Sequence, residues 1–468
     1  MSAERQESKL IRNLSFWDLM AISVGQIIGA GIMSSTGVAI GMTGTGVVLA
    51  FLLSPVLTII SIFPIAILGA TVPTTGGPYR YCSRLLGKTP GMIYLLLHIT
   101  MNVGLAQYAL SFASYLVSIT TGLDQHIVGI VILTFFFLTN LVGTKSAAVL
   151  NKIMSVALIG GLLLFIGFGL PKADIAYVIE PSHLFAHGTF AFISTLALLS
   201  SATAGAQVVA ELGGETKDAG RTIPKAMVAS TFGVGIFYVL IALVAAGVLP
   251  MDQVANQPLT LVARETMPGI AFYLFVIGAA LGATATTLNA TLSWVTKPLL
   301  VACDDGMLPK SLGNVNKHGV PWKLLTLFYL VGFIPLAGVP WKLLTLFYLV
   351  GFIPLAMRLD IAFITKFTTA NSLLSKLFVC FALFSLASKS GDLLKRSSIK
   401  LSPAGAKGMA VLGMVVLCVL SSSLLLNLSL MVVGFLVALV VVVLIYVRTY
   451  AKNVEIENDL LVDYTSEK

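Results

Sequence analysis

The chain has 468 residues, of which 57% are hydrophobic and only 10% are charged. Soluble domains carry roughly a quarter charged residues, so this composition excludes an ordinary soluble enzyme or binding domain and indicates a polytopic membrane protein. The formal net charge of +9 comes from Lys and Arg residues that sit in short clusters between apolar segments. Such clusters are typical of membrane-orientation signals, and they do not predict nucleic-acid binding.

Apolar segments of about twenty residues recur along nearly the whole chain, and each is long enough to cross a bilayer core. We therefore expect an all-α polytopic membrane protein with about 12 transmembrane helices. The polar N-terminal residues 1–14 give no sign of a cleaved signal peptide, so the first span is expected to anchor the chain. The predicted spans cover residues 15–38, 44–71, 91–119, 126–143, 150–170, 188–212, 225–249, 269–302, a region after 319, 361–387, 406–426 and 429–448.

Basic residues predict how these spans are oriented. Arg5, Lys9 and Arg12 precede the first span, and further basic clusters follow the second, fourth, sixth and eighth spans. Because Lys and Arg collect in cytoplasmic loops, this alternation places residues 1–14 and the tail 449–468 in the cytoplasm. The expected location is the cell (plasma) membrane, crossed many times.

A perfect tandem duplication interrupts the second half of the chain. The nineteen residues GVPWKLLTLFYLVGFIPLA occupy 319–337 and recur without a difference at 338–356. One crossing in this region keeps the later basic clusters, including Lys389 and Arg448, in the cytoplasm, whereas two crossings would place them outside. Each copy has only about sixteen apolar residues, which is marginal for a span. Two copies do not make a repeat architecture, so the sequence indicates a recent duplication or an assembly error and not the basis of function.

Two predicted spans contain small and polar residues where an apolar run is expected. In the first, VGQIIGAGIMSSTG places Gly29, Ala30 and Gly31 together; in the sixth, LLSSATAGAQVVAELGGE contains Ser200 and Gly205. Two broken segments, each first in a set of five spans, point to an inverted-repeat transporter. The repeats would cover residues 15–170 and 188–387, followed by two helices within 406–448. Close helix packing through small residues is the alternative for the first stretch.

These interruptions predict a site for an α-amino acid. An unwound first span would free the helix N-terminus at Gly29–Ile32, and such N-termini bind carboxylates. The carbonyl groups freed around Ser200–Ala202 of the sixth span would accept hydrogen bonds from an ammonium group. Non-helical backbone at membrane depth is tolerated where it lines a cavity or is buried in protein.

The chain resembles the amino acid–polyamine–organocation (APC) permeases. IIGAGI is similar to the unwound first helix of that family, and TTGGPYRYCSRLLG to the loop after its second span. AGAQVVAELGGETKDAGRTIPKA resembles the stretch between spans six and seven, and DDGMLPK the end of span eight. The resemblance covers nearly the whole chain outside the duplication. It implies the five-plus-five inverted repeat with two further helices, working by alternating access.

The same resemblance implies substrate contacts at particular residues. The carboxylate would bind at Gly29, Ala30, Gly31 and Ile32, and the amine at Ser200, Ser201 and Ala202, with Gly205 in the same break. Asn102 in span three matches a substrate-contacting Asn of one antiporter branch; interhelical hydrogen bonding is its alternative role. Ser201 stands where many members carry an aromatic gate, and span five lacks the lysine that several members use for coupling.

Ion coupling and gating have several candidate residues. Thr286 and Thr287, beside Thr284 on span eight, could serve a sodium site, although hydroxyls bonding to their own helix are the commoner arrangement. His98 in span three could relay protons or pack as a neutral group. Asp18 and Glu211 lie toward the cytoplasmic ends of spans one and six, where gate ion pairs would form. Lys297 can extend to the cytoplasm.

The sequence thus predicts a secondary carrier and not an enzyme. Because no acidic residue lies deep in spans one, three, six or eight, we expect neutral amino acids, moved by exchange or ion-coupled uptake. The alternatives are an amine, polyamine or cationic amino acid antiporter and, in another class, a transport-inactive sensor or partner protein. No cofactor or metal is expected, because the four cysteines have unrelated spacings and no metal-binding motif occurs. The expected partners are the amino acid and the lipid bilayer; monomer and homo-oligomer stay open.

Overall fold

The computed structural model describes residues 12–102, 104–120, 122–337, 361–425, 430–456 and 460. The second copy of the duplication, residues 338–356, lies outside the described residues, and so does most of both terminal segments. The predictions made for the path of that copy and for those segments therefore have no structural counterpart.

The described residues form helices and no β-strand. Eight of their helices are long and apolar enough to cross a membrane, and four shorter apolar helices accompany them. The chain is therefore a polytopic all-α membrane protein, as predicted. The elements are α2 (Phe16–Ile27), α3 (Ala30–Thr43), η1 (Gly44–Gly46), α4 (Val47–Thr71), α5 (Gly77–Leu85), α6 (Lys88–Met101), α7 (Gly104–Ile119), α8 (Gln125–Leu141), α9 (Thr144–Gly169), η2 (Leu170–Lys172), α10 (Ile175–Ile179), α11 (Pro181–Leu184), α12 (Gly188–Ala202), η3 (Ala206–Glu211), η4 (Gly213–Glu215), α13 (Ala219–Gly247), α14 (Met251–Val254), α15 (Thr260–Thr266), α16 (Gly269–Phe275), η5 (Val276–Leu281), α17 (Gly282–Trp294), α18 (Lys297–Asp304), η6 (Lys310–Gly313), α19 (Trp322–Ala337), α21 (Ile361–Lys389), η8 (Gly391–Arg396), α22 (Pro403–Leu425) and α23 (Leu430–Thr449).

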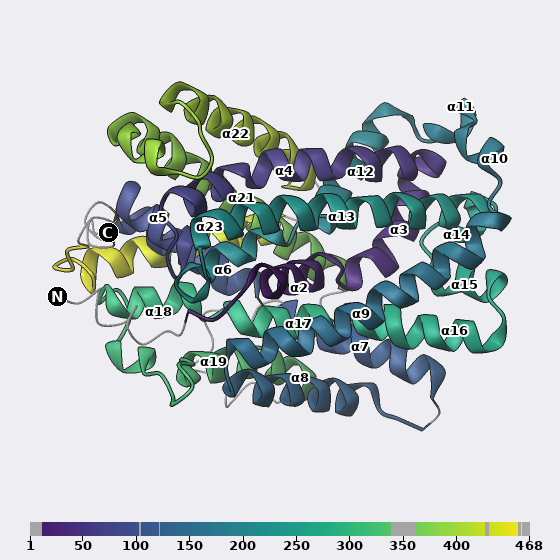
Figure 1. Cartoon of the computed structure of the whole chain (residues 1–468), viewed down its shortest axis with the longest axis horizontal. Coiled ribbons are helices and arrows are strands. Elements are labelled where there is room, and N and C mark those ends of the chain that lie inside the picture. The colour runs from purple at the N-terminus through teal and green to yellow at the C-terminus, as the bar shows by residue number, and fades with distance from the viewer. Residues whose placement is uncertain are drawn as a thin grey trace.

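Three of the predicted spans are interrupted at membrane depth. The first divides into α2 and α3 at Gly29, the third into α6 and α7 at Asn102, and the sixth into α12 and η3 before Gly205. Helices α9, α13 and α17 surround α2 and bury its interruption within the bundle (Figure 1). The backbone groups freed by the first break therefore lie inside protein, one of the places where irregular backbone is tolerated within a membrane.

The two ends of the bundle differ in charge. Helices α5 and α18 lie at one end, and the short helices α10, α11 and α14 lie at the other (Figure 1). We call the first the basic end, defined by Arg84, Lys145, Lys152 and Lys297. Short backbone bridges also lie there: Leu14 pairs with Thr216, and the loop before α5 pairs with the residue that follows η3.

Helices α19 and α21 flank the duplicated region, and the structure places one end of each. Near the start of α19, the Lys323 ammonium donates to the Ser311 carbonyl at 2.9 Å, beside η6. Near the end of α21, the Ser385 hydroxyl donates to the Leu85 carbonyl at 2.9 Å, beside α5. Both positions belong to the basic end, and the number of crossings between residues 319 and 360 stays a prediction because residues 338–360 lie outside the described part of the chain.

Candidate functional site

The break in the first span exposes a helix N-terminus inside the bundle. Helix α2 ends at Ile27, Gly29 adopts extended backbone as the N-cap of α3, and α3 then begins with Ala30, Gly31 and Ile32. Among the residues that the structure describes, no side chain caps this N-terminus. The first backbone N–H groups of a helix have no acceptor within that helix, so they are available to an anion.

Thr287 of α17 contacts residues on both sides of this break. Its hydroxyl donates to the Gly25 carbonyl at 2.7 Å and lies beside Gly29, where a Cβ atom would come within 2.8 Å of the threonine oxygen. A side chain at Gly29 would therefore displace this hydroxyl. Thr286 bonds only to carbonyls of its own helix, Gly282 and Ala283.

The break in the sixth span lies against the first. Helix α12 ends at Ala202, and Gly205 has a φ of 146°, a backbone conformation that other residues rarely adopt. A Cβ atom on Gly205 would come within 2.9 Å of the Gln26 carbonyl carbon and the Ile27 nitrogen. The glycine is thus needed for the backbones of the two broken spans to touch. The structure brings the two predicted interruptions together.

The predicted amine-binding residues, Ser200–Ala202, form the C-terminal end of α12. The Ser200 and Ser201 hydroxyls donate to carbonyls of their own helix, at Leu196 and Leu198. The Ser200 carbonyl accepts from the Thr58 hydroxyl of α4 at 3.0 Å and from the Thr203 hydroxyl at 3.4 Å. These carbonyls sit at the negative end of the α12 dipole, which favours a cation. Their role in substrate binding stays a prediction, as does that of Gly29–Ile32.

Three residues at the breaks were missed by the sequence analysis. The Gln26 side-chain oxygen accepts from the Thr291 hydroxyl and the Trp294 indole, both at 3.1 Å, and the Tyr238 hydroxyl donates to the Ile27 carbonyl at 3.0 Å. Gln26 stands next to the glycine cluster in an apolar span, a signal that the sequence contained. The contacts of Trp294 and Tyr238 depend on tertiary packing and had no such signal.

Two candidates of the third span bond to protein. The Asn102 amide donates to the His98 carbonyl at 2.7 Å and caps the end of α6. The His98 Nε2 atom bonds to the Val295 carbonyl at 2.9 Å, and its ring packs edge-on against Trp294. Both side chains are buried. His98 therefore bonds and packs across helices, whereas the bond of Asn102 lies within its own helix; a substrate role for Asn102 stays a prediction.

Ion pairs close the basic end. Asp18 contacts Lys145 at 2.6 Å and Lys152 at 2.7 Å, so α2 is tied to the start of α9. Lys297 is buried and pairs with Glu215, which corrects the expectation that it extends to the cytoplasm. A carboxylate within reach makes the buried ammonium tolerable without solvent.

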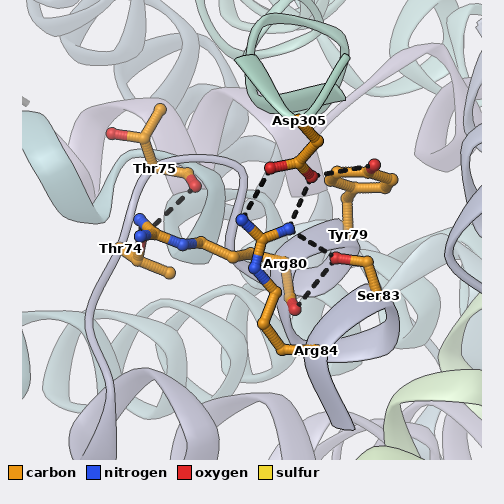
Figure 2. A network of polar contacts seen from close by, with 7 residues as sticks. All are labelled: Thr74, Thr75, Tyr79, Arg80, Ser83, Arg84 and Asp305. Atoms are coloured by element: carbon orange, nitrogen blue, oxygen red, sulfur yellow. Dashed lines mark hydrogen bonds and ion pairs between the residues drawn. The ribbon is translucent and has the colours of Figure 1, made fainter. Parts of the chain in front are cut away.

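A second group of contacts joins α5 to the end of α18 (Figure 2). Arg84 holds Asp305 through two hydrogen bonds of 2.5 and 2.6 Å, and the Tyr79 hydroxyl donates to the same carboxylate at 3.1 Å. Such forked pairs are strong and fix geometry. Burial, followed by the charge of Asp305, raises the pKa of Tyr79 well above its usual range, so the phenol stays a donor.

Glu211 does not take part in these ion pairs. It was predicted as a gate residue with Asp18, but its carboxylate accepts from the Tyr94 hydroxyl at 3.1 Å, and no basic side chain among the described residues pairs with it. Glu215, four residues later, pairs with Lys297 instead. The gate prediction for Glu211 therefore has no ion pair to support it.

Comparison with known sequences decides the family. A sequence model of the family described as "Amino acid permease" matches residues 14–456, nearly the whole chain. The chain belongs to the amino acid permease family. This confirms the resemblance drawn from the motifs of the first, second, sixth and eighth spans.

Proteins similar to this permease are named for different substrates. The branched-chain amino acid permease BcaP of Bacillus subtilis is 27% identical over 72% of this chain and 78% of its own length. The methylthioribose transporter of the same species is 25% identical over 68% and 72%. The aromatic amino acid transport protein AroP of Escherichia coli is 22% identical over 71% and 75%. Membership in the permease family therefore does not fix the substrate.

Proposed function

We propose that this permease is a secondary carrier that moves neutral amino acids across the cell membrane by alternating access. The observation that carries the proposal is the contact between the two broken spans, where Gly205 lies against the backbone of Gln26 and Ile27. One break offers helix N–H groups and the other offers helix carbonyls, within one buried region. The α-carboxylate and α-ammonium groups of an amino acid fit these two ends.

The carboxylate would bind the N–H groups that begin α3, at Gly29–Ile32, and the ammonium the carbonyls of Ser200–Ala202. We assign residues 15–170 and 188–387 to two inverted repeats, each opened by one broken span. We also assign the basic end to the cytoplasm, because Lys and Arg collect there. Ion pairs close that end, which supports a state in which the site is open to the outside of the cell.

The charge around the breaks favours a neutral substrate. Asp18 is already occupied by two lysines, and Glu211 bonds to Tyr94 of α6. The cavity that Glu211 lines contains neither Gly29 nor Ser200–Ala202, so we infer that neither carboxylate receives a cationic side chain at the breaks. A positively charged substrate would enter a buried region without a counter-charge, which is costly.

Counterflow in liposomes tests this proposal. Vesicles containing the purified protein are loaded with single unlabelled amino acids or amines, and entry of labelled leucine, phenylalanine or alanine is followed. Saturable entry driven only by internal neutral amino acids is expected. If internal arginine or a polyamine drives entry best, the substrate is cationic and the proposal of a neutral substrate is wrong. No exchange by correctly folded protein would favour ion-coupled uptake without exchange, or a sensor that does not transport.

A further inference from the structure

A small polar cavity lies beside the broken sixth span and is separate from the ion pairs of the basic end. Its volume is about 20 Å³, enough for one water molecule. Polar side chains from four elements line it: Tyr94 and His98 of α6, Gln207 and Glu211 of η3, Trp294 of α17 and Lys376 of α21. A cavity this small with so many ionisable groups is unusual for a membrane core, where such groups are costly and commonly functional.

Glu211 is the incompletely bonded acid of this cavity. The residue is 3% exposed, and only its Oε1 atom has a donor, the Tyr94 hydroxyl at 3.1 Å. Its Oε2 atom is buried and has no hydrogen-bond partner among the described residues. A buried carboxylate needs either further donors or a proton, so this oxygen is available for protonation.

Lys376 is the base that lines the same cavity. It is 4% exposed, and no acidic side chain among the described residues forms an ion pair with it. It lies within α21, a helix that packs on α6. Because Lys376 and Glu211 line the same water-sized cavity, one water molecule there can bond to both groups and carry a proton between them.

The cavity is connected to both breaks by hydrogen bonds. Gln207 accepts from the Gly205 backbone N–H at 3.0 Å, so one lining residue holds the break of the sixth span. Trp294, another lining residue, donates to Gln26 at the break of the first span. Glu211 lies on η3, which follows Gly205 directly, whereas Lys376 lies on a different helix. A movement of η3 relative to α21 therefore changes the separation of the acid and the base.

We propose that Glu211 and Lys376, which line this cavity, form a proton-binding site that couples amino acid movement to a proton gradient. In the closed state the pair is neutral overall and holds one proton as carboxylate and ammonium. When the site opens to the more acidic side, the carboxylate takes up one proton from water, and the pair carries one net positive charge. Opening to the other side releases that proton to water and restores the neutral pair.

The titratable groups nearest this pair lie on α5, α6 and α21. His98 and Tyr94 face the cavity from α6, and the buried Cys82 of α5 lies close enough to Glu211 for electrostatic interaction. Cys380 lies one turn beyond Lys376 on α21. Helices α4 and α17 contain no titratable residue. The further titratable groups on the packed elements are Tyr79, Arg80, Tyr81 and Arg84 of α5, Lys88 of α6, Asp18 of α2, Arg221, Lys225 and Tyr238 of α13, Tyr108 and Tyr115 of α7, Lys407 and Cys418 of α22, and Asp392 and Lys395 of η8.

Proton-driven uptake tests the inference, which rests on the proposed carrier function. Proteoliposomes with external pH one unit below internal pH receive whichever labelled neutral amino acid exchanges in counterflow, and an enclosed pH dye reports proton entry. The wild type should accumulate the label several-fold above equilibrium and acidify the lumen. Glu211→Gln and Lys376→Met should abolish both signals, while exchange without a gradient falls by less than tenfold. The glutamine keeps an acceptor for Tyr94.

A control variant and a double variant distinguish failure of the proton-coupling inference from failure of the proposed carrier function. Glu180→Gln, at an exposed position between α10 and α11, should behave as the wild type. The double variant should lose no more gradient-driven uptake than either single variant, because the two groups act as one site. Gradient-driven accumulation that persists in Glu211→Gln overturns the inference, and so does wild-type exchange that ignores the gradient. If the wild type shows neither exchange nor gradient-driven uptake, the carrier function itself fails.

Discussion

Replacing Gly205 by alanine should separate the two broken spans. The added Cβ atom would lie 2.9 Å from the Gln26 carbonyl carbon and the Ile27 nitrogen. Carbon contacts settle near 3.5 Å, so the backbones must part by about 0.5 Å. The φ of 146° adds a backbone cost of about 1–3 kcal/mol for a residue with a side chain. A loss of about 2 kcal/mol corresponds to a roughly 30-fold lower population of the state with touching breaks.

The assay is the initial rate of counterflow in liposomes with equal amounts of folded protein, measured beside thermal unfolding in detergent. Gly233→Ala is the matched control, because Gly233 lies inside α13 and no atom would meet its Cβ within 4 Å. We expect a drop of at least tenfold for Gly205→Ala and no drop for the control. Wild-type exchange by Gly205→Ala, or an equal loss in the control, would refute the reasoning.

Further predictions concern the other contacts of the site. Thr287→Val removes a donor from the Gly25 carbonyl and should slow counterflow about tenfold. The control Thr284→Val loses bonds to its own helix, and its counterflow rate should stay within twofold of the wild type. Equal rates for the two variants would contradict this prediction. Arg84→Met leaves a buried carboxylate without its cation, at a cost of about 3–5 kcal/mol. The substitution should therefore open the basic end and speed maleimide labelling of the buried Cys303, relative to the exposed Cys418. Unchanged labelling would show that the Arg84–Asp305 pair does not close a gate. Deleting residues 338–356 should leave exchange intact, because the first copy already supplies the whole of α19, and loss of exchange would assign the second copy a role.

The polytopic all-α class could be predicted because hydropathy and the length of the apolar segments decide it. The break at Gly29 was also predictable, since clustered small residues in an apolar run weaken the helix without offering packing in return. Thr284 and Thr286 bond to their own helix, which was the commoner expectation for such hydroxyls. These features depend on local sequence, and the family resemblance then added the pairing of the two breaks.

The partners of the acidic residues could not be predicted. Glu211 and Glu215 lie four residues apart and would share a face of an α-helix. After Gly205, however, the chain continues as 3₁₀ turns, whose residues per turn differ from those of an α-helix. The two carboxylates therefore point to different helices, one toward Tyr94 and the other toward Lys297. Lys376, by contrast, was visible in the sequence as a lysine inside an apolar run.

The backbone bridge at Leu14 has a practical consequence for work on this permease. The Asn13 and Leu14 N–H groups donate to the Glu215 carbonyl at 3.0 and 2.9 Å, and the Lys217 N–H donates back to the Leu14 carbonyl at 2.9 Å. The chain entering α2 is thus fastened to the loop that follows the broken sixth span. A rigid fusion partner joined close to Asn13 would pull on that loop. Affinity tags and fluorescent reporters are therefore better separated from this segment by a flexible spacer.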